Sequence, residues 1–131
     1  MASMSNIRRY GSHPVKCVSW NVKSLNHLVK FKKMTTHLKQ LNTDIAFLQE
    51  THIHSVNNLR LSRGWAGQVF QSNFQVKASG VAIMINNNVQ FTVSDVQTDS
   101  AGRYVIVVGE LYTLPVILAC IYAPNWDNPV F

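Results

Sequence analysis

Residues 45–50 read Ile-Ala-Phe-Leu-Gln-Glu, a short apolar run that ends abruptly in a carboxylate. An apolar run of this length between polar residues predicts a buried β-strand. Glu50 then lies where the strand ends, at an edge of the sheet that faces a ligand or a metal rather than the core. The alternative is an ordinary solvated glutamate that begins a loop.

The composition excludes a disordered or fibrous protein and favours a polyanionic partner. The chain has 131 residues, 47% of them hydrophobic and 14% charged, which is enough for one globular domain with a real core. Lysine and arginine number 12 against 6 acidic residues, a net charge of +6. Such an excess favours polyanionic partners such as nucleic acid over acidic-protein or cation substrates.

The N-terminal residues and the two cysteines indicate the cellular compartment of the protein. Residues 1–14 are polar and predict a flexible leader before a domain spanning residues 15–131. They include no apolar segment of the kind found in secretion signals, so we expect an intracellular protein, nuclear or cytoplasmic and not secreted. Cys17 and Cys120 lie in apolar segments and are expected to be reduced and buried.

The remaining pattern predicts one helix among six to seven strands. Val15–Asn21 alternates apolar and polar residues and forms the first strand, and apolar residues at three- and four-residue steps predict a helix over Leu28–Leu41. Asn86–Asn88 predicts a hairpin turn. The fold class is α/β, a layered sandwich, with an α+β layer fold as the alternative. Further strands are expected at Gly67–Ser72, Ser79–Ile85, Val89–Ser94, Tyr104–Leu111 and Val116–Tyr122.

The predicted helix carries a lysine-rich outer face made of Lys30, Lys32, Lys33 and Lys39. Such a face is usually solvated surface, and the alternative is contact with a nucleic-acid backbone.

Two groups of residues have the chemistry of a metal site. If the strand continued past Glu50, then Glu50, His52 and His54 would share one face, as zinc ligands can. That geometry needs an extended backbone, whereas the residues that follow read as loop. Two surface histidines beside a strand end are the alternative.

The second group gathers polar residues that follow apolar strands: Asn21, Glu50, Tyr122 and Asn125. If these strands are neighbours, one carboxylate and several neutral polar groups converge. Magnesium prefers oxygen ligands, and one or two carboxylates together with a substrate phosphate often hold it. Each residue also has a structural alternative, such as a turn cap or a core aromatic.

Five blocks together resemble the endonuclease/exonuclease/phosphatase family, and most closely the endonuclease domain of LINE-type (non-LTR) retrotransposons. The resemblance covers residues 15–131 and implies a four-layered α/β sandwich. It further implies Mg²⁺-dependent cleavage of a phosphodiester, in retrotransposons the nicking of target DNA. The blocks are Ser19–Val22, Leu48–His52, Gly64–Trp65, Ser79–Ile83 and Ile121–Asn125.

The resemblance also implies roles for four residues. Glu50 resembles the family's metal-binding carboxylate, with Mg²⁺ as the expected ion and Mn²⁺ as the alternative. Asn21 resembles the asparagine that helps to place metal and phosphate, and Tyr122 the tyrosine that contacts the scissile phosphate. Asn125 resembles a polar residue beside that tyrosine which touches the DNA backbone.

The chain departs from the family after the Tyr-Ala-Pro-Asn block. The Gly-Asp-x-Asn and Asp-His motifs that follow in the family do not occur before Phe131. We therefore expect an N-terminal half, weakly active or inactive as a nuclease because the general base is missing, and prone to self-associate through an uncovered sheet. The alternatives are a non-catalytic nucleic-acid-binding remnant and a phosphatase of the same fold.

Overall fold

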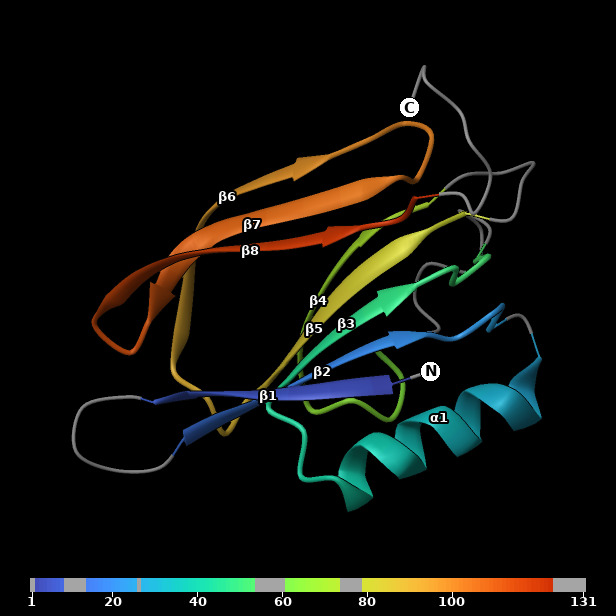
Figure 1. The fold of residues 1–131 in the computed structure, drawn as a ribbon, viewed down its shortest axis with the longest axis horizontal. Coiled ribbons are helices and arrows are strands. Elements are labelled where there is room, and N and C mark those ends of the chain that lie inside the picture. The colour runs from blue at the N-terminus through green and yellow to red at the C-terminus, as the bar shows by residue number, and fades with distance from the viewer. Residues whose placement is uncertain (1, 9–13, 26, 54–60, 74–78, 124–131) are drawn as a thin grey trace.

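The computed structural model describes residues 2–8, 14–25, 27–53, 61–73 and 79–123. Within these residues the chain forms one helix and eight strands in two sheets (Figure 1). The elements are β1 (Ala2–Arg8), β2 (Pro14–Asn21), α1 (Leu28–Gln40), β3 (Ile45–Gln49), β4 (Gly67–Ser72), β5 (Val81–Asn86), β6 (Phe91–Thr98), β7 (Tyr104–Leu111) and β8 (Leu114–Ile121).

The larger sheet, sheet A, has the order β1-β2-β3-β5-β4. Among its described strands only β2 and β3 are parallel, and their pairing runs from Cys17 opposite Ile45 to Asn21 opposite Gln49. A parallel pair needs a long crossover, and here α1 supplies it. The parallel arrangement brings the carboxyl ends of β2 and β3 to the same edge of the sheet.

Helix α1 covers one face of sheet A. Phe31, Met34 and Leu38 follow the three- and four-residue spacing of an amphipathic helix and are buried in the core beneath it. The helix ends where Asn42 takes a left-handed backbone conformation, with φ 54°. The sequence prediction of this helix is confirmed to within one residue.

The smaller sheet, sheet B, is the antiparallel meander β6-β7-β8 and packs on the other face of sheet A. The core between the sheets includes Ile45 and Ile83 from sheet A and Val107 and Leu118 from sheet B. The layers are therefore helix, sheet and sheet, as Figure 1 shows. This confirms the predicted fold class, part of an α/β sandwich.

Two local predictions were wrong. Ala2–Arg8 was expected to lie in a flexible leader, but it pairs with β2 as the antiparallel strand β1, because a polar segment can still satisfy the backbone groups of a sheet edge. The turn at Asn86–Asn88 exists, with Val89 N donating to Asn86 O at 3.0 Å, but it closes no hairpin. Both edges of β5 are already paired, with β3 and β4, so the chain passes into sheet B.

Among the described residues, no helix is long and apolar enough to cross a membrane.

Candidate functional site

Asn21 and Glu50 lie side by side because β2 and β3 are parallel and end together. Val22 N donates to Gln49 O at 3.0 Å, and Ser24 N donates to Glu50 O at 2.7 Å, so the loops that leave the two strands are tied to each other. Both side chains are half-buried. The parallel pairing therefore brings Asn21 and Glu50 to the same edge of sheet A.

Tyr122 reaches the same place from sheet B. The Sγ of Cys120, near the end of β8, donates to Leu48 O at 3.3 Å, and Tyr122 N donates to Arg103 O at 2.7 Å. Burial raises the pKa of the Tyr122 phenol above its ordinary value, and the charge of Glu50 and a hydrogen bond to its carboxylate raise it further. The Tyr122 hydroxyl therefore donates a hydrogen bond to the Glu50 carboxylate, a contact between the end of a strand of sheet B and the end of a strand of sheet A.

The Gln49 side chain connects the strands that carry Asn21, Glu50 and Tyr122, a role that the sequence did not predict. Its side-chain Nε2 lies 3.2 Å from Ser19 Oγ on β2 and 3.4 Å from Cys120 Sγ on β8. The amide therefore links three strands beneath the cluster formed by Asn21, Glu50 and Tyr122. The sequence contains one indication of this role, because Gln49 is a polar residue at a position of an otherwise apolar strand that faces the core.

The backbone turns sharply where these strands end. Lys23, Ser24, Glu50 and His52 have φ of 49°, 80°, 54° and 52°, a region that residues other than glycine rarely adopt. Strand β3 therefore stops at Gln49, and the extended backbone that the zinc hypothesis required is absent at Glu50 and His52. His54 lies outside the described residues, and within them no three His, Cys, Asp or Glu side chains gather as a metal cluster.

The segment after Glu50 is hydrogen-bonded to the backbone of Ser79 and Gly80. Thr51 N donates to Gly80 O at 3.0 Å, and His52 N donates to Ser79 O at 2.9 Å. Gly80 has φ +101°, and a Cβ there would lie 2.4 Å from Thr51 Oγ1. This close approach admits only glycine.

The donor set of the cluster suits a hard cation. Glu50 supplies a half-buried carboxylate and Asn21 an amide oxygen, which also accepts a hydrogen bond from Lys23 N at 3.2 Å. Oxygen ligands of this kind, few in number and open to water, fit Mg²⁺ better than zinc, which favours nitrogen and sulfur.

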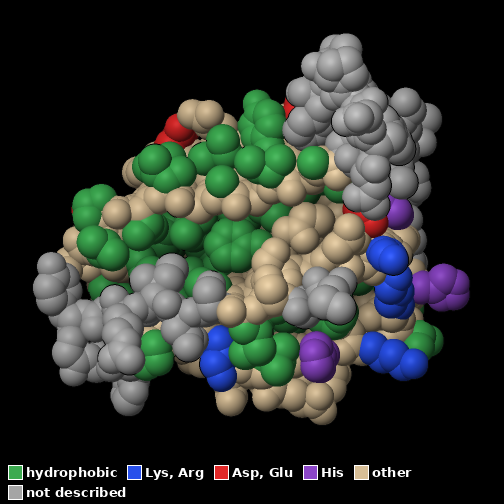
Figure 2. Space-filling view, in the orientation of Figure 1, with side chains coloured by type: hydrophobic (Ala, Val, Ile, Leu, Met, Phe, Trp, Pro, Cys, Tyr) green, Lys and Arg blue, Asp and Glu red, His purple; other side chains and the backbone are tan. Residues whose placement is uncertain are grey.

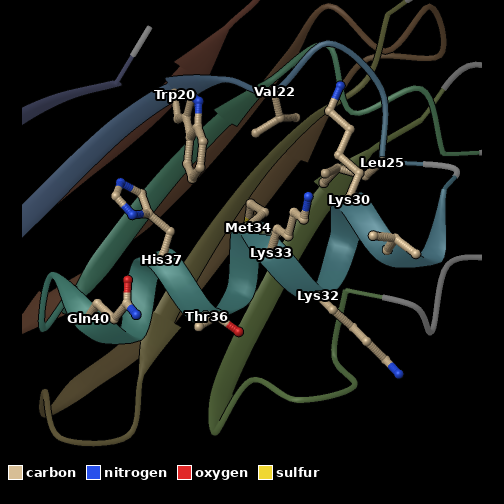
Figure 3. A pocket seen from close by; sticks show the side chains of 11 residues that line it. Trp20, Val22, Leu25, Lys30, Lys32, Lys33, Met34, Thr36, His37 and Gln40 are labelled. Atoms are coloured by element: carbon tan, nitrogen blue, oxygen red, sulfur yellow. The ribbon is translucent and has the colours of Figure 1, made fainter.

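A groove of about 630 Å³ lies beside the cluster, between α1 and the end of β2 (Figure 3). Trp20 stands over it, with its ring centroid 5.2 Å from that of His37 in an edge-on contact. Lys30, which lines the groove, donates to Lys23 O. Figure 2 shows Lys and Arg side chains on that side of the molecule. The groove is lined by Trp20, Val22, Leu25, Val29, Lys30, Lys32, Lys33, Met34, Thr36, His37 and Gln40.

Of the four predicted site residues, three meet in this cluster. Asn125 lies outside the described residues, so its proposed contact with the DNA backbone stays a prediction.

Three solved structures have a fold similar to that of this chain. Zebrafish (D. rerio) TDP2 in complex with single-strand DNA product is 21% identical, with a TM-score of 0.62 over 86% of this chain and 47% of that one. The AP endonuclease LMAP of Leishmania major is 18% identical, with a TM-score of 0.63 over 87% and 41%. The endonuclease domain of the telomere-specific non-LTR retrotransposon TRAS1 is 17% identical, with a TM-score of 0.58 over 87% and 48%.

The chain thus spans less than half the length of each of these proteins, and at such identities the likeness concerns the fold. The sequence itself matches the Endonuclease/Exonuclease/phosphatase family over residues 18–130. Because this match covers most of the chain, the protein belongs to the endonuclease/exonuclease/phosphatase family.

Proposed function

We propose that the chain carries the metal and phosphate site of a Mg²⁺-dependent phosphodiesterase that acts on DNA. The observation that supports this most directly is the convergence of Glu50, Asn21 and Tyr122 at the ends of β2, β3 and β8. Family membership and the net charge of +6 agree with it. The solved relatives include two endonucleases and a protein bound to single-strand DNA product.

Each residue has a distinct task in this proposal. Glu50 and the Asn21 amide would hold the ion, which would supply Lewis-acid polarisation of a phosphoryl oxygen. Tyr122 is protonated at neutral pH and does not repel a phosphate. Its single hydroxyl donor would pass from the Glu50 carboxylate to a phosphate oxygen when the substrate binds. The Tyr122–Glu50 contact places that hydroxyl beside the metal-binding carboxylate.

Cleavage by this chain alone should be slow. Glu50 contributes one carboxylate, and no His, Asp or Cys pair joins it in the part of the chain that the structure describes. A water molecule attacking the phosphate would lack a well-placed general base, whose contribution is typically about 10² to 10⁴ in rate. We therefore expect Mg²⁺-dependent binding of DNA to be easier to detect than nicking.

The test compares DNA binding and plasmid nicking in Mg²⁺ and in EDTA for the wild-type chain, Glu50→Gln and Glu110→Gln. Glu110 is an exposed carboxylate on β7 and serves as the matched control. We expect Mg²⁺ to strengthen binding in the wild type and in Glu110→Gln but not in Glu50→Gln, with nicking weak throughout. DNA binding that is equal in Mg²⁺ and in EDTA, and equal in the wild type and in Glu50→Gln, would refute the proposal. Rapid nicking would refute only the expectation that cleavage is slow.

A second function, non-catalytic binding of nucleic acid, is favoured by the groove beside α1. Lys30, Lys32 and Lys33 line its rim, and Trp20 offers an aromatic surface of the kind on which bases stack. Binding of this kind depends on salt and not on Mg²⁺.

A further inference from the structure

The groove between α1 and the end of β2 has two chemically different ends (Figure 3). Trp20 and His37 lie at one end. Lys30 and Lys33 lie toward the other end, while the side chain of Lys32 points away. Because a helix rises about 1.5 Å per residue, Lys33 and Lys30 lie about 6 Å and 10 Å along α1 from His37. One end of the groove is therefore aromatic and the other is cationic, and one small ligand can reach both.

The floor of the groove is apolar. Val22, Leu25 and Met34 line it, and all three are buried in the core beneath α1. Its volume of about 630 Å³ lies within the range of about 300 to 1,000 Å³ that is typical of small-molecule sites. A ligand that fills this space needs an apolar body in addition to its polar groups.

The cationic end has no carboxylate beside it to neutralise its charge. Helix α1 contains no acidic residue, and none of the described residues that line the groove is Asp or Glu. Lys30 donates one of its three N–H groups to Lys23 O and keeps two for a ligand. With Lys33 beside it, this end favours an anion that accepts several hydrogen bonds at once, such as a phosphate group.

The aromatic end suits a flat ring that carries hydrogen-bonding groups. Trp20 is half-buried, and its ring meets that of His37 edge-on at a centroid distance of 5.2 Å. Gln40 lines the same end with a side-chain amide that can both donate and accept. A nucleobase offers a π face to the indole and hydrogen-bonding groups to the imidazole and the amide, whereas an acyl chain offers neither.

We propose that this groove binds one nucleotide, with its base against Trp20 and its phosphate at Lys30 and Lys33. The proposal rests on the second candidate function, which it narrows from a nucleic-acid strand to a single nucleotide unit, and it does not involve the metal site. A free nucleotide and one unit of a single strand present the same base and phosphate, so the experiment has to distinguish these two sources.

NMR titration of the full chain in EDTA tests the proposal. The probe is deoxyadenosine 5′-monophosphate, followed through the indole N–H of Trp20 and the ring of His37. Both signals should shift and saturate, whereas the indole N–H of Trp65, which donates to Ile85 O at 3.3 Å, should not move. Deoxyadenosine and inorganic phosphate should each bind about tenfold or more weakly, because each of them engages only one end of the groove.

Two charge reversals on α1 provide a matched pair of variants. Lys33→Glu should weaken binding of the monophosphate about tenfold and leave binding of deoxyadenosine unchanged, because it repels only the phosphate. Lys39→Glu lies on the same helix but outside the groove, and it should change neither affinity. Both lysines are exposed, so both variants should fold.

Three further measurements decide the outcome. Shifts of Trp20 by octanoate as large as those by the monophosphate would overturn the proposal in favour of a site for acyl anions. Salt-dependent binding of single-stranded DNA without any shift of Trp20 by the monophosphate would also overturn it, and would leave the second candidate function standing. Displacement of the monophosphate by a lower concentration of a single-stranded hexanucleotide would identify the bound nucleotide as a unit of a strand, and displacement only at an equal or higher concentration would identify it as a free nucleotide.

Discussion

The hydrogen bond between Tyr122 and Glu50 links the two sheets at the level of single residues, and it can be measured as a pKa. Glu50→Gln removes a negative charge, so the Tyr122 pKa should fall, yet remain above its ordinary value because burial is the larger cause of the shift. Titration of ¹³C-labelled tyrosine rings by NMR measures this change. Glu110→Gln should leave the Tyr122 titration unchanged, and an equal shift in both variants would contradict the contact.

Gly80 allows the close packing of the backbone that follows Glu50. Gly80→Ala should destabilise the chain by about 2 to 4 kcal/mol, because it adds steric overlap with Thr51 to the cost of a positive φ. Gly64→Ala is the matched control, since Gly64 also has a positive φ but its nearest neighbour, Thr35 Cγ2, lies 3.7 Å from the added Cβ. It should cost about 1 kcal/mol in urea unfolding. Equal losses would show that the contact with Thr51 does not matter.

The sequence predicted Asn21, Glu50 and Tyr122 as site residues because each follows an apolar strand, and side chains at the carboxyl ends of neighbouring strands tend to lie close together. It did not predict the positive φ at Glu50 and His52, since neither is glycine or asparagine. Such conformations are set by surrounding contacts, here the hydrogen bonds that Thr51 N and His52 N donate to Gly80 O and Ser79 O, which belong to a segment far along the chain.

At the scale of elements, the lysine face of α1 makes the second candidate function testable. Lys33 lines the groove and Lys39 lies outside it, so Lys33→Gln and Lys39→Gln are matched losses of one charge. If single-stranded DNA lies along the groove, Lys33→Gln should reduce the slope of log affinity against log salt by about 0.7, measured by fluorescence anisotropy in EDTA. Lys39→Gln should leave the slope unchanged, and equal effects would indicate diffuse attraction rather than a groove.

Elements with a strong local pattern were predicted well. Helix α1 and the strands β2 to β5, β7 and β8 show periodic apolar residues or turn signals of their own. The strand expected at Val89–Ser94 is instead β6, Phe91–Thr98, and most of it is exposed. β1 was missed because its residues are polar and it exists only by pairing with β2. The path from β5 to β6 was misread because nothing local to Asn86–Asn88 reveals that both edges of β5 are already occupied.

At the scale of the whole molecule, the two buried thiols predict an alkaline limit to stability. Burial raises the pKa of Cys17 to about 11, with a contribution from the charge of Asp44, and burial raises the pKa of Cys120 to about 11. Both pKa values are raised in the folded state. The associated stability is therefore complete below pH 9 and is lost as pH rises from 9 toward 11.

The loss amounts to about 2 to 3 kcal/mol for each thiol. Urea unfolding between pH 7 and 11 should show a flat region followed by a fall. In Cys120→Ala the fall should be about half as large, measured from that variant's own stability at pH 7. A fall of unchanged size would show that groups other than this thiol cause it.

The two sheets are built from separate stretches of chain, sheet A from residues 2–86 and sheet B from residues 91–121. During synthesis the ribosome therefore releases sheet A first. The face formed by Val15, Ile45 and Ile83 then has no cover until β7 and β8 have emerged, because those strands supply the other side of that core. While residues 87–121 are being added, the nascent chain therefore exposes an apolar face, the kind of surface that makes partly synthesised chains prone to aggregate.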